Sequence, residues 1–246
     1  PTLLNRYPKP TALEALLATR LGVRADQVLV TAGGDDALDR AAKALLEPGR
    51  ELILPVPTFE MIGRYARLAD STVCEVPWPG GAYPTDAVVA AITPRTAAIA
   101  VVTPNNPTGA IATAADLARL SDAAPQAVLL VDLAYTEFAE TDLTGATLAL
   151  PRAIAFRTLS KAWGLAGIRV GYAVGPAALI RWLRAAGNPY AVSGPSVALA
   201  LAHLSAPEAD ATMAAFVARV RGERDVLEAD AAALGRDELR RHHGRP

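Results

Sequence analysis

The segment 97–132 reads AAIAVVTPNNPTGAIATAADLARLSDAAPQAVLLVD and decides the fold class. It contains two apolar runs of strand length, Ala97–Thr103 and Ala127–Asp132, separated by a helical stretch, Thr113–Ala123. Short strands that are apolar throughout are typical of parallel sheets buried on both faces, where helices connect consecutive strands. The segment therefore predicts an α/β fold with a mostly parallel sheet sandwiched by helices.

The same alternation continues on both sides of this segment. Further strands are expected at Gln27–Val30, Glu51–Pro55, Ile154–Thr158 and Val170–Val174. Helices are expected at Thr11–Leu21, Asp36–Leu46, Phe59–Leu68, Pro176–Ala186, Ser196–His203 and Ala209–Ala233. At the start of the first helix we expect Thr11 to be the N-cap, with Glu14 completing a capping box.

The composition excludes several classes of protein. The chain has 246 residues, 52% of them hydrophobic, which suits one large domain or two small ones and excludes a disordered chain. Its 24 basic and 25 acidic residues form no charge block, so neither a nucleic-acid partner nor a polybasic membrane anchor is suggested. The single cysteine excludes a disulfide framework and a cysteine-based zinc cluster. No segment is typical of a signal peptide or a membrane span, and we expect a cytoplasmic protein.

Lys161 is the most informative single residue. It follows a predicted strand and precedes the apolar, glycine-rich stretch Ala162–Gly167, a setting that favours the neutral amine and suits Schiff-base chemistry. A surface lysine is the alternative, but lysine is scarce in this arginine-rich chain. Arg169, eight residues later, could hold a phosphate with two hydrogen bonds or could be a structural ion-pair partner.

Other polar groups also follow predicted strands. Asp132 ends a buried strand and needs a partner such as a protonated ring nitrogen, and Tyr135 could bind a ring oxygen. A helix cap and a packed aromatic are the alternatives for these two residues. The loop 103–109 could place an amide over a ligand, the segment 33–36 could bind an anion at a helix N-terminus, and Phe59 could stack on a planar ring. Each of these three features also has a purely structural interpretation.

Taken together and in order, these motifs resemble the fold-type I pyridoxal-phosphate aminotransferases of class I/II, and within them the histidinol-phosphate aminotransferase branch. The resemblance covers roughly Asn5 to Leu234. It rests on Asn5–Pro8, Ala32–Asp36, Pro57–Phe59, Asn105–Gly109, Asp132–Phe138 and Thr158–Tyr172, the last of which is highly specific.

The resemblance implies pyridoxal 5'-phosphate as the cofactor and assigns roles at its ring. Lys161 would form the Schiff base with the cofactor and later move the proton between the substrate and the cofactor. Asp132 would pair with the pyridinium nitrogen. Asn106 and Tyr135 would hydrogen-bond the phenolic oxygen, and Phe59 would stack on the ring.

The resemblance also implies a phosphate site and a partner subunit. The phosphate would be held by the backbone of Gly34 and Asp35 and by the side chains of Thr158, Ser160 and Arg169. Tyr7 would reach the phosphate of the partner subunit, so a homodimer is implied. No metal site is predicted.

The implied activity is transamination between a small-molecule amino donor and a 2-oxo acid. Histidinol phosphate with 2-oxoglutarate is the leading pair, which would place the protein in histidine biosynthesis. An aromatic amino acid donor is the second candidate, and a threonine-phosphate decarboxylase of the same fold is the third. A truncated remnant that binds the cofactor without catalysis is an alternative of a different class.

The two ends of the chain depart from the family pattern. We expect an N-terminal arm and helix at 1–27, a cofactor-binding large domain at 28–190, and interdomain helices with the start of an incomplete small domain at 191–246. We therefore expect the core of a longer enzyme, cut short at both ends, with exposed apolar surface along the last helix.

The charged stretch Gly235–Gly244 replaces a family strand that contains Asn-Phe. Residues 237–243 can be encoded so that a frame one base later yields Thr-Asn-Phe-Val-Val-Thr. We therefore expect a shifted reading frame near Leu234 or Gly235, and a naturally divergent tail is the alternative.

Overall fold

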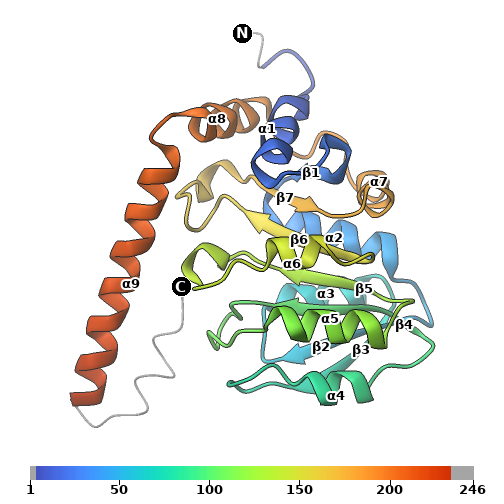
Figure 1. Ribbon diagram of the computed structural model, residues 1–246. Helices are drawn as coiled ribbons and strands as arrows, with labels where there is room; N and C mark the ends of the chain where they lie inside the picture. The colour runs from blue at the N-terminus through green and yellow to red at the C-terminus, as the bar shows by residue number, and fades with distance from the viewer. Residues whose placement is uncertain (1–3, 234–246) are drawn as a thin grey trace.

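A seven-stranded sheet forms the centre of the protein. The computed structural model describes residues 4–233 (Figure 1). The strand order is β1-β7-β6-β5-β4-β2-β3. The strands are β1 (Val28–Thr31), β2 (Glu51–Val56), β3 (Thr72–Pro77), β4 (Thr96–Val102), β5 (Val128–Asp132), β6 (Ala153–Thr158) and β7 (Gly171–Val174). Strand β7 runs antiparallel to both of its neighbours, whereas the other pairings of the described sheet are parallel.

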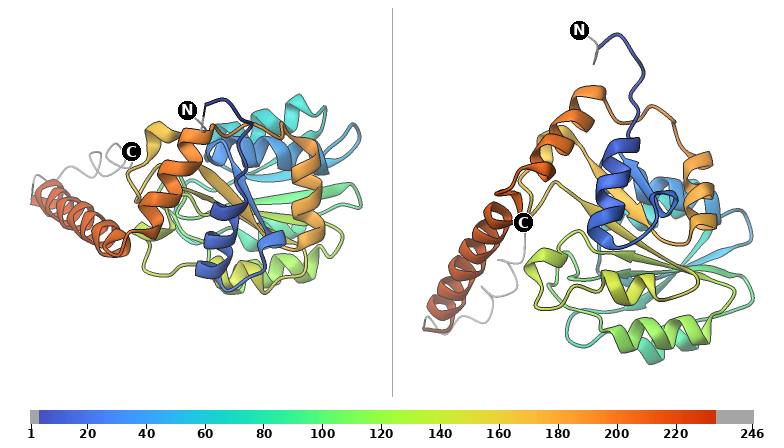
Figure 2. Two further views of the ribbon diagram at one scale, coloured as in Figure 1. Left: turned by 90° about the horizontal axis from the view of Figure 1, so that it is seen from above. Right: turned by 45° about the horizontal axis from the view of Figure 1, so that its top comes forward.

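Helices cover both faces of this sheet, as the view from above shows (Figure 2). The α-helices are α1 (Thr11–Leu21), α2 (Gly33–Leu45), α3 (Glu60–Leu68), α4 (Thr85–Ala90), α5 (Ala114–Ala123), α6 (Thr144–Leu148), α7 (Ala177–Ala186), α8 (Gly194–Ser205) and α9 (Ala209–Ala233). Short 3-10 helices are η1 (Ala25–Gln27), η2 (Thr136–Phe138) and η3 (Ala166–Ile168). One hydrophobic core lies under α1, α5 and α8, and a second lies under α2, α3 and α7.

The predicted α/β fold is confirmed, and each predicted strand lies in the sheet. Sequence analysis missed β3, because this edge strand is partly exposed and has no continuous apolar run. It also missed the antiparallel direction of β7. A loop that contains only η3 joins β6 to β7, so the chain turns back instead of crossing over through a long helix.

The capping box predicted at the start of α1 is wrong. Pro10 is the N-cap, no side chain caps the helix, and Thr11 is already helical. The Glu14 carboxylate instead accepts a hydrogen bond from the Val30 backbone N–H at 3.1 Å and pairs with Arg184 at 3.1 Å. Donors on β1 and α7 therefore outcompete the local cap, because the buried Glu14 carboxylate requires hydrogen bonds.

Helix α9 extends away from the body of the protein (Figures 1 and 2). Its first half is anchored by the buried Val217 and by Phe216. The rings of Phe216 and Phe138 pack edge to face, with 6.3 Å between their centroids. Further along, Val226 and Leu227 are 60% and 51% exposed, which agrees with the expected lack of cover on this helix.

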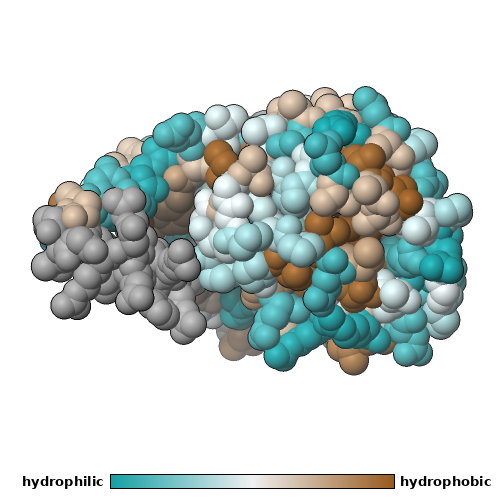
Figure 3. Space-filling view, turned by 90° about the horizontal axis from the view of Figure 1, so that it is seen from below, coloured by the Kyte–Doolittle hydropathy of each residue, from teal (hydrophilic) through white to brown (hydrophobic). Residues whose placement is uncertain are grey.

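The surface seen from below mixes apolar and hydrophilic residues rather than forming one continuous apolar area (Figure 3).

The predicted frame shift and the charged stretch 235–244 lie outside the described residues. In the described part of the chain, no helix is both long and apolar enough to span a membrane.

Candidate active site

A cavity of about 240 Å³ opens where β4, β5 and β6 end and α2 begins. The carboxyl ends of parallel strands meet at this edge of the sheet, which is where α/β proteins bind ligands. The residues that line it are Gly34, Asp35, Leu38, Phe59, Val102, Asn106, Asp132, Ala134, Tyr135, Phe156, Arg157, Thr158, Ser160, Lys161 and Arg169. Every residue predicted for the site therefore lines this cavity, with the exception of Tyr7.

The start of α2 and the arginine beside it place donors suited to an anion at one end of the cavity. The first turn of a helix leaves backbone N–H groups without helical partners, and the helix dipole adds partial positive charge. The Arg169 guanidinium lies 3.3 Å from Ser160 Oγ and 3.4 Å from Asp35 Oδ2. Gly33 has a φ of +80°, and a Cβ there would lie 2.5 Å from Arg169 Nη2. Glycine at this position therefore lets the guanidinium approach the helix start.

Asp132 lies at the floor of the cavity. The sheet register places it between Val102 on β4 and Phe156 on β6, and its side chain is buried. Its Oδ1 accepts a hydrogen bond from the Ala134 backbone N–H at 3.0 Å. Burial raises the pKa of this carboxyl from 3.8 to about 6, because the charged form loses its water. A cation placed at this oxygen would stabilise the carboxylate.

Lys161 lies in the loop between β6 and β7, and its Nζ is 5.0 Å from the centroid of the Tyr135 ring. The loop is closed by backbone hydrogen bonds: Leu159 donates to Val170 and Leu165 donates to Leu159, both at 3.0 Å. These bonds hold the lysine at the end of a buried strand. The amine is therefore presented to the cavity by an ordered backbone.

Asn106 and Phe59 complete the cavity wall, and Asn105 ties their segments together. The buried Asn105 side chain accepts a hydrogen bond from Thr58 Oγ1 at 2.6 Å and donates to the Pro57 carbonyl at 2.9 Å. The asparagine next to the cavity residue thus acts as a brace between two loops. Sequence reasoning gave Asn105 no separate role.

Tyr7 does not line the cavity. It is 73% exposed and stacks on the ring of Tyr190, with 4.2 Å between centroids. Its predicted contact with a partner subunit stays a prediction.

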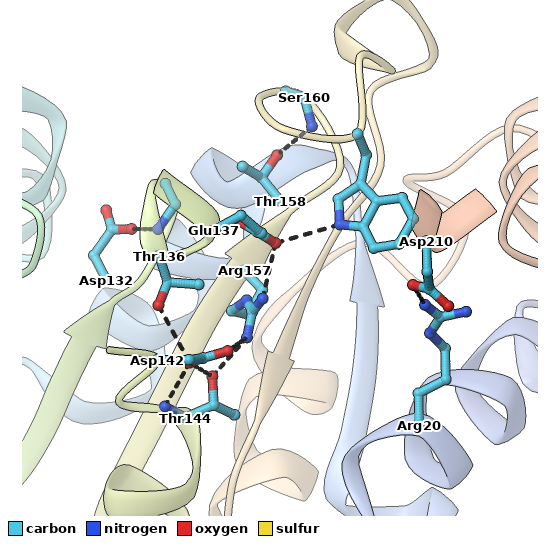
Figure 4. Close-up of polar contacts among 12 residues, drawn as sticks. Arg20, Asp132, Thr136, Glu137, Asp142, Thr144, Arg157, Thr158, Ser160 and Asp210 are labelled. Carbon is cyan, nitrogen blue, oxygen red and sulfur yellow. Dashed lines mark hydrogen bonds and ion pairs between the residues drawn. The ribbon is translucent and has the colours of Figure 1, made fainter. Parts of the chain in front are cut away.

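Sequence reasoning also missed Arg157, which lines the cavity and pairs with Glu137 and Asp142 (Figure 4). The signal was available, because an arginine within an otherwise apolar strand needs buried partners.

The residues of the cavity suit pyridoxal phosphate. Burial leaves the Asp132 carboxylate with an elevated pKa, which fits a protonated pyridine nitrogen as its partner. The start of α2, with Ser160 and Arg169 beside it, fits a phosphate group, and Lys161 supplies an amine for an aldehyde. The three chemical features of this cofactor thus match three separate donor sets around one cavity.

Comparisons with known proteins point to one family. The family model for aminotransferase class I and II matches residues 2–241. An aromatic amino acid aminotransferase of Rhodococcus jostii (strain RHA1) is 38% identical, covering 91% of this chain and 64% of that protein. A histidinol-phosphate aminotransferase of Ruegeria pomeroyi (strain ATCC 700808 / DSM 15171 / DSS-3) is 35% identical, covering 94% of this chain and 64% of that protein.

Solved structures agree with this match. A mutant of Thermus thermophilus aspartate aminotransferase has a TM-score of 0.85 at 29% identity, covering 94% of this chain and 65% of that one. The chain thus spans less than two thirds of the length of these relatives, 64% of the two named above. Because the family model matches nearly the whole chain, the protein belongs to the class I and II aminotransferases, a family that depends on pyridoxal phosphate.

Proposed function

We propose that this protein is the cofactor-binding part of an enzyme that transfers an amino group between a small amino compound and a 2-oxo acid. The observation that carries the proposal is that Lys161, the buried Asp132 and the start of α2 with Arg169 beside it all line one cavity. A structural lysine would not need a buried carboxylate and an anion site at the same place.

Each residue would make a distinct contribution. When bound, pyridoxal phosphate supplies a ring that stabilises negative charge on the substrate. The Lys161 amine would bind the aldehyde group and would hold the proton that moves during the reaction. Asp132 would keep the ring nitrogen protonated by pairing with it. Asn106 and Tyr135 orient the ring oxygen, and Phe59 stacks on the ring.

The phosphate would be held where α2 begins. The backbone of Gly34 and Asp35 donates at the start of α2, while the Arg169 guanidinium supplies positive charge. Thr158 and Ser160 add side-chain hydroxyls. This anchoring fixes the position of the reacting aldehyde relative to Lys161.

Histidinol phosphate with 2-oxoglutarate, or an aromatic amino acid with 2-oxoglutarate, is the proposed substrate pair. The named relatives include both kinds of enzyme: an aromatic amino acid aminotransferase at 38% identity and a histidinol-phosphate aminotransferase at 35%. Transamination assays with each donor, followed by detection of the 2-oxo product, distinguish them. A decarboxylase acting on threonine phosphate would instead release carbon dioxide. A remnant without catalysis would bind the cofactor and turn over no donor.

We further propose a homodimer in which Tyr7 completes the partner's phosphate site. The exposed stack of Tyr7 and Tyr190 supports this, because large exposed aromatic rings are typical of interfaces. Light scattering tests the mass. In a dimer, Tyr7→Phe should weaken cofactor binding, whereas an unchanged affinity would refute the contact.

We propose the residue ranges 1–27, 28–190 and 191–246 as the arm, the large domain and the start of the small domain. The division is supported by α8 and α9, which follow the last strand of the sheet.

The direct test of cofactor binding is spectroscopic. Protein mixed with pyridoxal phosphate should develop a visible absorption band that Lys161→Ala abolishes. Lys43→Ala is the matched control, because this lysine is exposed on α2 and pairs with Asp39 at 2.5 Å. Loss of the band in the control, or no band in the unaltered chain, would refute the proposed binding.

A further inference from the structure

A cluster of charged side chains surrounds the buried pair of Arg157 and Glu137 at the cavity, and its third member, Asp142, is half exposed (Figure 4). Arg157 on β6 and Glu137 in η2 have side chains that are each 9% exposed, and Arg157 Nη2 donates to Glu137 Oε1 at 2.8 Å. Arg157 Nη1 donates to Asp142 Oδ2 at 3.0 Å and to Thr144 Oγ1 at 2.6 Å. Asp142 in turn accepts from Thr136 Oγ1 at 3.2 Å. One guanidinium thus connects β6, η2 and the start of α6.

Glu137 accepts a second hydrogen bond from the loop 159–170 between β6 and β7, which carries Lys161 and is called the lysine loop below. The indole Nε1 of Trp163 donates to the same Glu137 Oε1 at 3.3 Å. Trp163 follows Lys161 by two residues, and Glu137 follows Tyr135 by two residues. The Lys161 amine and the Tyr135 ring are themselves 5.0 Å apart. The Glu137 carboxylate therefore joins the two loops that present this pair of groups to the cavity.

The physical chemistry of buried charges separates this arrangement from ordinary packing. Both members of a buried ion pair lose their water, so apolar residues of similar size would stabilise the protein at least as well. A hydrogen-bonded ion pair differs from such residues in being directional, because donor and acceptor must keep a defined geometry. In this cluster the defined geometry is the spacing between the lysine loop and η2.

We propose that Arg157, Glu137 and the indole of Trp163 are positioning residues that set where the Lys161 amine meets an aldehyde in the cavity. This inference rests on the proposed function. Of the three side chains, Arg157 lines the cavity, whereas Glu137 and Trp163 do not. Their effect is transmitted through the hydrogen bond between Trp163 and Glu137, with Arg157 fixing the carboxylate.

Trp163→Phe is the sharpest test, because it removes the indole N–H and keeps an aromatic ring. Trp182→Phe on α7 is the matched control, since Trp182 is half exposed and does not line the cavity. Each protein is mixed with pyridoxal phosphate, and borohydride then fixes the reagent on lysines as a stable secondary amine. Mass spectrometry follows the labelling of Lys161 against time. We expect Lys161 labelling at least tenfold slower in Trp163→Phe than in the control, with labelling of Lys43 unchanged.

The outcomes distinguish the positioning role of Trp163 from the proposed function of Lys161. Equal rates at Lys161 in the two tryptophan variants would overturn this inference and leave the proposed function intact. Failure to label Lys161 in the unaltered chain would overturn the proposed function itself. A melting temperature near that of the unaltered chain, combined with slow labelling, supports positioning over a general loss of structure. If Trp163→Phe does not fold, Glu137→Gln is read in the same way. If neither variant folds, the cluster serves stability and the inference is wrong.

Discussion

Asp132 offers a prediction whose size can be worked out from its burial. Its pKa is raised from 3.8 to about 6 because the folded protein removes the carboxylate from water. The folded protein therefore binds this proton more tightly than the unfolded chain does. The stabilising contribution of the protonated group is fully present below pH 3.8 and is lost as the pH rises through about 6. Without cofactor, this group makes the protein less stable at neutral pH.

The magnitude follows from the two pKa values. The full difference corresponds to about 3 kcal/mol, at about 1.36 kcal/mol for each pH unit. Between pH 8 and pH 5, the linkage relation gives this carboxyl a gain in unfolding free energy on the order of 1 kcal/mol. Asp132→Asn has no proton to bind and lacks this gain. We therefore expect the variant to be more stable than the unaltered chain at pH 8, and this difference in unfolding free energy to be smaller at pH 5 by on the order of 1 kcal/mol.

Urea unfolding of the cofactor-free protein at the two pH values measures this difference. Asp122→Asn is the control, because that carboxylate is exposed on α5. The stability difference between Asp132→Asn and the unaltered chain should change with pH, whereas the difference for Asp122→Asn should change much less. A constant difference for Asp132→Asn would refute the argument from burial. With pyridoxal phosphate present, the same variant should bind the cofactor more weakly, because an amide does not hold the ring nitrogen in its protonated form.

Three other predictions concern the phosphate site, the sheet and the last helix. Arg169→Ala should weaken binding of pyridoxal phosphate by about tenfold or more and leave binding of pyridoxal nearly unchanged, by absorbance titration. Gly171→Ala should destabilise the protein by about 1–3 kcal/mol in urea unfolding, since its Cβ would lie 2.6 Å from the Gly33 backbone. Arg221→Ala should speed hydrogen exchange in α9 and leave β5 protected, because Arg221 donates to the Phe138 carbonyl at 3.3 Å. The first prediction is contradicted if Arg169→Ala weakens the binding of pyridoxal phosphate and of pyridoxal equally. The second is contradicted if Gly171→Ala leaves the free energy of unfolding unchanged, and the third if Arg221→Ala leaves hydrogen exchange in α9 unchanged.

The local pattern of the chain was sufficient to determine most of the alternation of strands and helices, but not the partly exposed β3 or the short helices α4 and α6. Ala127–Asp132 is apolar up to its final carboxylate. Continuous apolar runs of this length are typical of strands buried on both faces of a sheet, and β5 is buried along its whole length. Because parallel strands end at one edge of the sheet, the polar residues that follow them could be predicted to converge there. Asp132, Lys161 and Asn106 do line the same cavity.

Tertiary structure alone decided which buried polar groups became partners. Glu14 matched a local capping pattern, yet its carboxylate accepts hydrogen bonds from the Val30 backbone N–H and the Arg184 guanidinium. Both donors lie outside its own helix. The position of Arg157 in an apolar strand predicts that it needs polar partners but does not identify them. In the folded chain these partners are Glu137 and Asp142, which come from other segments. A sequence pattern reports the preferences of neighbouring residues. The pairing of buried charges depends on which distant groups the packed chain brings within hydrogen-bonding distance, because water is no longer there to solvate them.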